Sequence, residues 1–383
     1  MFNRLTRTGI LASLGILAYL AMGGGQLQAA ITYVAIDLNP SGFTGSEAWI
    51  TNGTQQVGYG YGSATGGVGY SHALLWSGTA QSYVDLNPSG FAGSEARCTN
   101  GTQQVGYGYG SSGYPHALLW NGTAQSYVDL NPSGFTASYS YSINDAHQAG
   151  YGYSPATGGV CYPHALLWSG TAQSYVDLNP SGYEDSVAMA MTSTQQVGYA
   201  FTTDTVSHGH AALWSGTAQS FVDLNPKGFV SSIACGISGT QQVGYGGGTA
   251  AKNYCDALLW NGTAQSCVDL TPDGFTLSQA NGTNGTQQVG YGYGSATGNK
   301  YHALLWSGTA QRYVDLHQFV PSGFIQSYAN SIDGQGNIAG YAEDANLTPH
   351  AILWIPVPEP STLALLGIGA IGLLAFAWRR RKA

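Results

Sequence analysis

Charged residues are scarce in this chain. They make up 8% of its 383 residues, whereas ordinary soluble domains carry about 25%. Between residues 31 and 360 there are nineteen acidic residues and only five basic ones, which gives a net charge of −14. The basic residues are Arg97, Lys227, Lys252, Lys300 and Arg312. A body this acidic repels the phosphate backbone of nucleic acids. Nucleic acid is therefore excluded as a partner, and cations, neutral glycans and proteins remain.

Cysteines are also few, and their number is odd. None of the five recurs from one repeat to the next: Cys98, Cys161, Cys235, Cys255 and Cys267. At least one is unpaired in an oxidising compartment. Cys255 and Cys267 flank an Asn-Gly turn and form the one pair that a hairpin could bring together, but the fold does not depend on them.

The N-terminus predicts export. Arg4 and Arg7 precede the apolar run "GILASLGILAYLAM" and the small-residue stretch "GGGQLQAA". This order is that of a secretory signal peptide, which we place at residues 1–30 as a helix. An uncleaved anchor is the alternative, although the run is short for spanning a bilayer.

The C-terminal segment, residues 356–383, predicts a membrane helix over 363–378 followed by a basic tip. It resembles the PEP-CTERM sorting signal in six residues: Pro358, Glu359, Pro360, Arg379, Arg380 and Arg381. The cations favour the cytoplasmic side. The resemblance implies an exosortase-type membrane protease as partner, in a Gram-negative bacterium that makes exopolysaccharide. It also implies an inner-membrane anchor before tail cleavage, and then a location at the cell surface or outside the cell.

Between the two ends the chain repeats one sequence seven times. Each copy carries an Asp-Leu pair and ends an apolar run with a tryptophan, and the tryptophans follow one another at steps of 44 to 48 residues: Trp76, Trp120, Trp168, Trp214, Trp260, Trp306 and Trp354. Within the first copy we expect strands at "EAWIT", "QQVGYGYG", "HALLW" and "AQSYVDL", separated by Asn-Gly and Ser-Gly turns. Four strands in about 45 residues is the size of a propeller blade. The alternating glycines of the second strand are expected to let a neighbouring sheet approach closely.

The two ends of the repeat region complement each other. The sequence "ITYVAIDL" after residue 30 is a fourth strand without the first three, and the last copy stops after "HAILWIP". Joining them completes one blade and removes two sheet edges. The sequence therefore predicts an all-β, seven-bladed β-propeller over residues 31–355, closed by the N-terminal strand. A linear solenoid is the alternative.

The repeats resemble the extracellular HAF-type repeat family. The matching words are "HALLW", the following Asp-Leu, "SINDAHQAGY" (Ser142–Tyr151) and "SIDGQGNIAGY" (Ser331–Tyr341). The resemblance implies export and repeat architecture and leaves the ligand open.

Two repeated motifs contain residue types that can bind a metal ion. Six histidines precede the apolar "ALLW" (or "AALW", "AILW") words, but equivalent positions on adjacent blades lie too far apart for shared coordination, so we expect them to form hydrogen bonds. Asp85, Asn87 and Ser89 in "DLNPSG" resemble the front of a calcium loop, yet the acid at its end is missing. Turn chemistry explains the same residues. No cofactor is expected, with calcium as the alternative.

No catalytic constellation emerges, because the Ser, His and Asp residues that could form a triad belong to the repeats. Five acids outside the repeated words could supply a glycosidase pair: Glu184, Asp185, Asp204, Glu343 and Asp344. We expect function in loops that differ between copies, at residues 156–162, 201–208 and 249–256. Tyrosines that could stack on sugars are Tyr70, Tyr114, Tyr162 and Tyr301.

These observations predict an exported, non-enzymatic surface or matrix protein that binds or organises exopolysaccharide. A secreted glycan-cleaving propeller is the alternative, and ice binding is a weaker one, because a propeller offers no flat threonine array.

Overall fold

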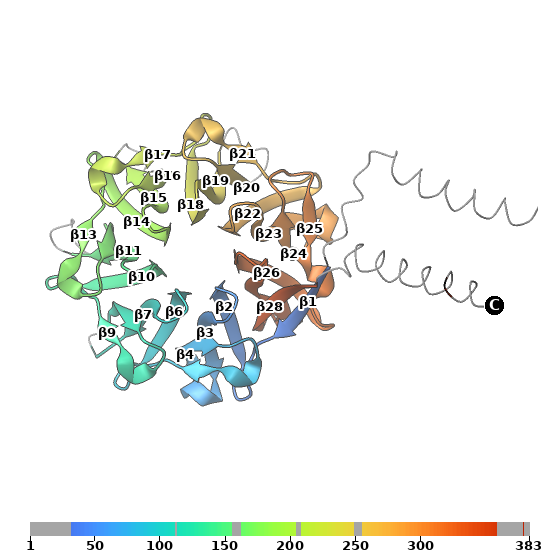
Figure 1. Ribbon diagram of the computed structural model, residues 1–383, viewed down its shortest axis with the longest axis horizontal. Coiled ribbons are helices and arrows are strands. Elements are labelled where there is room, and N and C mark those ends of the chain that lie inside the picture. Colours follow the sequence, from blue (N-terminus) through green and yellow to red (C-terminus); the bar gives the residue numbers. More distant parts are fainter. Residues whose placement is uncertain are drawn as a thin grey trace, which may run out of the picture. The chain divides into compact units, whose positions relative to one another are not determined.

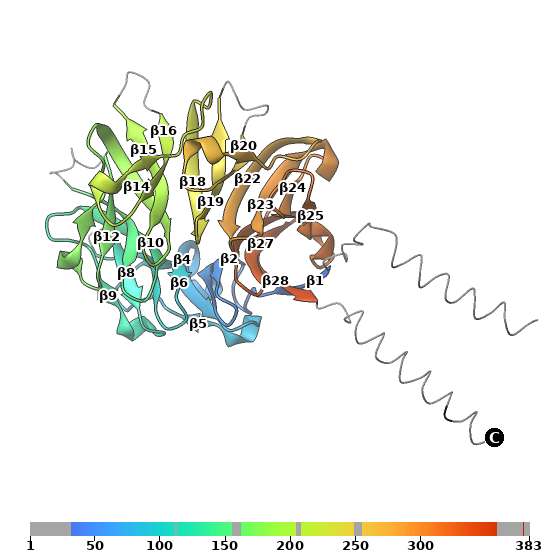
Figure 2. The same cartoon turned by 45° about the horizontal axis from the view of Figure 1, so that its top comes forward.

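The computed structural model describes residues 32–111, 113–154, 162–203, 208–248, 255–357 and 378. Residues 33–356 form one compact unit. Within the described residues, seven antiparallel four-stranded sheets stand side by side around a ring (Figures 1 and 2). The prediction of an all-β, seven-bladed propeller is confirmed.

In every blade the first strand lies nearest the centre of the ring (Figure 1). From the inside outward, the first three blades consist of β2 (Gly45–Thr51), β3 (Gln56–Gly62), β4 (Gly67–Trp76) and β5 (Val84–Asp85); β6 (Gly93–Thr99), β7 (Gln104–Tyr109), β8 (Pro115–Trp120) and β9 (Val128–Asp129); and β10 (Ala137–Ile143), β11 (Gln148–Tyr153), β12 (His164–Trp168) and β13 (Val176–Asp177).

The remaining four blades repeat this order. They consist of β14 (Tyr183–Met191), β15 (Gln196–Thr202), β16 (Gly209–Trp214) and β17 (Val222–Asp223); β18 (Ser231–Ser238), β19 (Gln241–Gly247), β20 (Asp256–Trp260) and β21 (Val268–Asp269); β22 (Phe275–Thr283), β23 (Gln288–Gly294), β24 (Tyr301–Trp306) and β25 (Tyr313–Asp315); and β26 (Phe324–Ile332), β27 (Ile338–Asp344), β28 (Pro349–Val357) and β1 (Thr32–Asp37).

The last blade takes its outer strand from the beginning of the chain. β1 pairs with β28 (Figure 1), and the Leu38 amide donates to the Ala351 carbonyl at 2.8 Å. Nδ1 of His350 donates to Oδ2 of Asp37 at 2.8 Å across 313 residues of sequence. The ring is therefore closed as predicted, and the solenoid alternative is wrong.

The predicted fourth strand "AQSYVDL" is mostly wrong. Its first residues form a short 3₁₀ helix, and only two residues, Val84 and Asp85, pair with β4. The cause is Ser82, whose hydroxyl donates to the Thr79 carbonyl and accepts from the Ser77 amide, which curls the chain before it can extend. The same turn recurs as η2 (Ala80–Ser82), η3 (Ala124–Ser126), η5 (Ala172–Ser174), η6 (Ala218–Ser220) and η7 (Ala264–Ser266).

Among the described residues, three further 3₁₀ helices lie in connections: η1 (Ser63–Thr65), η8 (Ser295–Thr297) and η9 (Leu316–Phe319).

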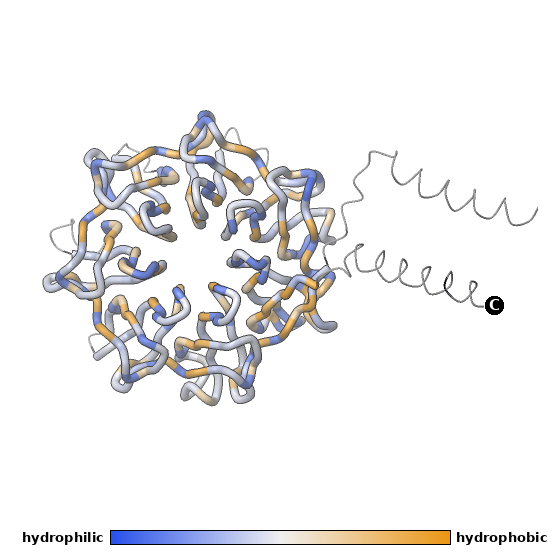
Figure 3. Tube along the Cα trace, in the orientation of Figure 1, coloured by the Kyte–Doolittle hydropathy of each residue, from blue (hydrophilic) through white to orange (hydrophobic). Residues whose placement is uncertain are grey.

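The core lies between the blades. The "ALLW" words of the third strands are buried on both faces, and all seven of their tryptophans have no solvent exposure. Six of these tryptophans pack against the preceding sheet, as Trp120 on β8 packs against Val57 and Leu75 of the first blade. Hydrophobic and hydrophilic segments both border the centre of the ring (Figure 3).

The glycines of the second strands make room inside their own blade. A Cβ at Gly58 would overlap the carbonyl oxygen of Glu47 on β2, and the same overlap recurs at Gly106, Gly150, Gly198, Gly244, Gly290 and Gly340. The expectation that they admit a neighbouring blade is therefore wrong. They accommodate the innermost strand of the same sheet, which bulges at this point.

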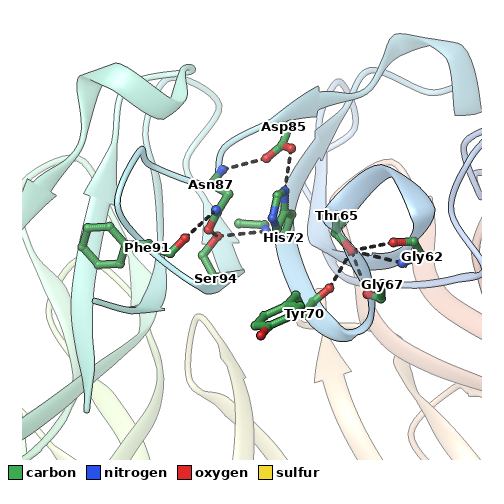
Figure 4. A network of polar contacts seen from close by, with 10 residues as sticks. Gly62, Thr65, Gly67, Tyr70, His72, Asp85, Asn87, Phe91 and Ser94 are labelled. Atoms are coloured by element: carbon green, nitrogen blue, oxygen red, sulfur yellow. Dashed lines mark hydrogen bonds and ion pairs between the residues drawn. The ribbon is translucent and has the colours of Figure 1, made fainter. Parts of the chain in front are cut away.

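A buried serine joins each blade to the next. The Ser94 hydroxyl on β6 accepts from the Ala73 amide on β4 at 3.1 Å and donates to Oδ1 of Asn87 at 2.7 Å (Figure 4). The first of these bonds recurs at Ser46, Ser138, Ser186, Ser232, Ser278 and Ser327. The connection "DLNPSG" is thus a structural joint between blades.

Several predictions fall on parts of the chain outside the described residues. These are the signal peptide at 1–30, the sorting motif Pro358, Glu359, Pro360 and Arg379–Arg381, and the membrane helix at 363–378 except Trp378. No helix within the described part of the chain is long and apolar enough to cross a bilayer.

The suggested Cys255–Cys267 bridge is wrong, because both thiols are free. Cys255 accepts from the Gln279 side chain of the next blade at 3.8 Å. Cys267 packs against a core cluster instead.

Candidate functional site

All seven innermost strands carry a β-bulge at the same position. In β2 the register shifts between Ala48 and Ile50, which leaves Trp49 as the extra residue. A bulge re-aims the extra side chain and is common at functional sites. The seven extra residues, here called the bulge residues, are Trp49, Arg97, Tyr141, Met189, Cys235, Asn281 and Asn330.

The bulge residues surround one cavity at the centre of the ring. This central cavity has a volume of about 470 Å³, and all seven bulge residues line it. The volume lies in the usual range for small-ligand sites, about 300–1,000 Å³. The bulge residues comprise six residue types, although the second and third strands of the blades are nearly identical. The ring is thus regular in its framework and asymmetric at its centre.

One wall of the central cavity holds a cation between aromatic rings. The guanidinium carbon of Arg97 lies 3.8 Å from the centroid of the Trp49 ring and 4.9 Å from that of Tyr141. Its Nη1 lies 3.6 Å from Oε2 of Glu95, which is an ion pair but not a hydrogen bond, and the Arg97 side chain is 19% exposed. Among the described basic residues, Lys227, Lys300 and Arg312 are exposed. Arg97 is the half-buried cation.

An acid with an altered pKa lies beside this cation. Burial raises the pKa of Glu47 to about 7, and repulsion from Glu95 and Glu343 adds to the rise. The Tyr59 hydroxyl, which donates to Glu47, and the charge of Arg97 act in the opposite direction. Glu47 is therefore protonated far more readily near neutral pH than an exposed glutamate.

The second strand of each blade carries a tyrosine near the central cavity, and two of these, Tyr291 and Tyr341, line it. Each pairs across the strands with a residue two positions before a bulge residue, as Tyr59 pairs with Glu47. Burial raises the pKa of all seven: Tyr59, Tyr107, Tyr151, Tyr199, Tyr245, Tyr291 and Tyr341. They remain neutral donors at physiological pH. Tyr291, for instance, donates to Oε1 of Gln279 at 2.5 Å.

The other wall is uncharged. Met189, Cys235 and Ile237 supply apolar and sulfur groups, and burial raises the pKa of the Cys235 thiol to about 12. Asn281 and Asn330 supply amides, whose Nδ2 atoms donate to the backbone of the next blade at 3.0 and 2.9 Å. The thiol is too weakly acidic to serve as a nucleophile.

The sequence analysis missed this site. Glu47, Trp49, Glu95 and Arg97 occupy "SEAWIT" and "SEARCT", which read as ordinary short strands. The sequence did contain a signal for the site: the innermost strands differ from copy to copy, whereas the second and third strands are nearly identical. The bulge itself, which needs the glycine opposite, has no comparable sequence signature.

The repeated histidines form hydrogen bonds to the repeated aspartates. Nδ1 of each donates to an aspartate Oδ2 at 2.7 or 2.8 Å, in the pairs His72–Asp85, His116–Asp129, His164–Asp177, His210–Asp223, His302–Asp315 and His350–Asp37 (Figure 4). The described residues contain no group of three or more His, Cys, Asp or Glu side chains arranged to hold a metal ion.

The candidate calcium ligands already have protein partners. Oδ1 of Asp85 accepts from the Asn87 amide at 2.8 Å, its Oδ2 accepts from His72, and Oδ1 of Asn87 accepts from Ser94 (Figure 4). Ser89 is exposed at the turn. The geometry is that of an Asx turn. Calcium binding by Asp85, Asn87 and Ser89 stays a prediction.

The candidate sugar-stacking tyrosines do not come together. Tyr70 and Tyr114 are 52% and 51% exposed and Tyr162 is 36% exposed, whereas Tyr301 stacks on Tyr328 with centroids 5.4 Å apart. Tyr70 lines a separate cavity of about 400 Å³ with Glu95. The variable loops fall mostly outside the described residues, at 155–161, 204–207 and 249–254.

The candidate glycosidase acids are dispersed. Burial raises the pKa of Asp185 to about 6, with repulsion from Glu184. Glu343 accepts from Gln326 at 2.9 Å and affects Glu47, and Asp344 closes an exposed turn by accepting the Asn346 amide. Asp204 lies outside the described residues.

Comparison with known families identifies the C-terminal segment. Residues 356–382 match the PEP-CTERM protein-sorting motif. The chain is therefore an exported protein that carries this sorting signal. No curated protein matches the sequence.

Solved structures resemble the fold at very low sequence identity. The β-propeller domain of the Trilobed protease from Pyrococcus furiosus, described as having an open velcro topology, has a TM-score of 0.54 and 9% identity over 82% of this chain and 94% of its own. An oligogalacturonate lyase from Vibrio parahaemolyticus has a TM-score of 0.52 and 8% identity, over 86% of this chain and 97% of its own. A puromycin hydrolase has a TM-score of 0.51 and 8% identity over 84% of this chain. This chain spans only 55% of the length of that enzyme. These similarities show the propeller fold alone.

Proposed function

We propose that this chain is a non-enzymatic surface or matrix protein that binds exopolysaccharide at the central cavity. In this proposal the C-terminal segment holds the chain in the inner membrane until an exosortase-type protease processes it. The resemblance of the repeats to the extracellular HAF-type family supports the same location.

One observation carries the binding proposal. The innermost strands differ between the repeated blades, whereas the second and third strands are nearly identical, and the bulge residues of the innermost strands line the central cavity. Repeats that served only to build a ring would have no physical need for a tryptophan, an arginine, a methionine and amides at equivalent positions. An asymmetric lining is what recognition of one ligand requires.

The chemistry of the lining suits a sugar. Trp49 and Tyr141 offer flat apolar faces against which the C–H face of a pyranose can pack. Asn281, Asn330 and Gln279 offer amide groups within the same cavity, and hydroxyl-rich ligands are fixed by a few such polar groups. Net negative charge over the rest of the body limits adhesion to polyanions.

The test is co-sedimentation of residues 31–356 with the producing organism's exopolysaccharide, with calcium and with chelator, followed by an assay for new reducing ends. Saturable binding that Trp49→Ala lowers, without new reducing ends, supports the proposal. Tyr127→Ala is the matched control, because Tyr127 is an exposed aromatic residue outside the central cavity. Absence of binding overturns the proposal, and a calcium requirement would assign the ions to the "DLNPSG" loops.

Glycan cleavage is the second candidate, and Glu47 is the observation that favours it. Burial and the charge of Glu95 raise the pKa of Glu47 to about 7, which is the acidity of a general acid, although neither carboxyl lines the central cavity. New reducing ends that disappear in both Glu47→Gln and Glu95→Gln would replace the binding proposal with this one.

A further inference from the structure

Among the described residues, the Arg97 guanidinium in the wall of the central cavity has no hydrogen-bond acceptor. It contacts two rings and the Glu95 carboxylate, and none of these contacts is a hydrogen bond. Guanidinium N–H groups are strong donors that are normally paired, so a cation in a cavity wall without a protein acceptor is free to take one from a ligand.

The orientation of Arg97 restricts what that acceptor can be. Rings contact the guanidinium from two neighbouring blades, so its faces are occupied and its N–H edge remains for a ligand. A planar guanidinium edge matches a carboxylate, which accepts two parallel hydrogen bonds. The Trp49 ring, which lies against Arg97, helps to hold the guanidinium in this position.

Charge elsewhere on the protein limits how many carboxylates the ligand can carry. The body has a net charge of −14 between residues 31 and 360, and Glu95 lies 3.6 Å from the cation. A densely charged polyuronate would be repelled along the rest of the surface. A mostly neutral polymer that presents one carboxylate to the cavity meets both conditions.

We propose that the central cavity recognises a carboxylate on a sugar of a sparsely charged polysaccharide, held by the N–H edge of Arg97. This inference rests on the proposed polysaccharide-binding function and names its chemical class. Arg97 is then the residue that determines specificity, and the amides across the cavity contact sugar hydroxyls.

The test compares methyl β-glucuronide with methyl β-glucoside, which differ only at the carboxylate, by calorimetric titration of residues 31–356. We expect the glucuronide to bind about tenfold more tightly, the equivalent of one charge-assisted hydrogen-bond pair. Arg97→Gln should abolish the preference. Arg97→Lys, which keeps the charge without the planar fork, should retain only part of it.

Arg312→Gln is the matched control, because Arg312 is exposed on the ring. Thermal unfolding of each variant shows whether the fold is kept. If Arg97→Gln does not fold, an indole ¹⁵N–¹H shift of Trp49 in the unmodified chain, caused by glucuronide and not by glucoside, tests the same contact.

Equal affinity for the two glycosides, or a preference that persists in Arg97→Gln, overturns the inference. Acetate that binds as tightly as the glucuronide would overturn the sugar part, because the site would then take any carboxylate. The polysaccharide co-sedimentation is scored separately. Co-sedimentation that is unchanged in Arg97→Gln overturns the inference alone, whereas its absence in the unmodified chain overturns the proposed function.

Discussion

Gly58 shows how a single residue controls the central cavity. A side chain at this position would overlap the Glu47 carbonyl oxygen, next to the bulge that presents Trp49. Gly58→Ala should therefore cost about 2–4 kcal/mol of unfolding free energy, because backbone rather than a flexible side chain must move. Urea denaturation measures this. Gly69→Ala is the matched control, since a Cβ there meets nothing within 4 Å, and equal losses in the two variants would contradict the role of the bulge.

Glu47 makes the stability of the ring depend on pH. Its pKa is about 7 in the folded chain and 4.5 as a free side chain, so the folded state binds the proton more tightly. The stabilisation is complete below about pH 4.5 and is lost as pH rises through about 7, by about 2 kcal/mol after allowance for partial exposure.

Urea unfolding at pH 5 and pH 8 tests this dependence. Glu47→Gln should be more stable than the unmodified chain at pH 8 by roughly that amount and should lose this part of the pH slope. Asp145→Asn, which changes an exposed turn residue, should leave the slope intact. Parallel pH profiles for all three proteins would show that Glu47 is not the group responsible.

At the level of elements, the blades are joined through the serine of each innermost strand. Ser94→Ala leaves the Ala73 amide and Oδ1 of Asn87 without partners in a buried joint, which should cost about 2 kcal/mol. Ser186 offers a built-in comparison. It accepts from Ala165 in the same way, but the equivalent Oδ1 of Asn179 is buried without a partner.

Ser186→Ala should therefore cost about 1 kcal/mol less than Ser94→Ala. Chemical denaturation of the two variants measures the difference. Identical costs would mean that the Asn–Ser bond contributes nothing to joining the blades.

Across the whole molecule, the sequence predicted the framework and missed the centre. The number of blades and the closing strand follow from repeated words and complementary ends, which are long-range regularities. The Asn-Gly hairpins follow from turn chemistry, and Gly53 has the positive φ of 96° that such a turn needs. The prediction of a full fourth strand was wrong because Ser82 forms local hydrogen bonds that compete with strand extension. The central site was missed because its residues, such as Trp49 and Arg97, differ between repeats and come together only when all seven blades meet around one cavity.

Closure of the ring is a property of the whole chain, and removing β1 tests it. A chain that starts at Asn39 lacks Tyr33, Ile36 and Leu38, of which Tyr33 and Leu38 are buried in the last blade. Loss of their burial should cost about 5 kcal/mol. The truncation also exposes the backbone edge of β28, which can then pair with other chains.

Light scattering during gel filtration should show oligomers of the truncated chain, and its thermal unfolding should begin at a lower temperature. A synthetic peptide covering residues 31–38 should restore the monomer, because it supplies the missing strand without the covalent link. A truncated chain that stays monomeric with an unchanged unfolding temperature would mean that blade packing alone, and not the shared blade, holds the ring closed.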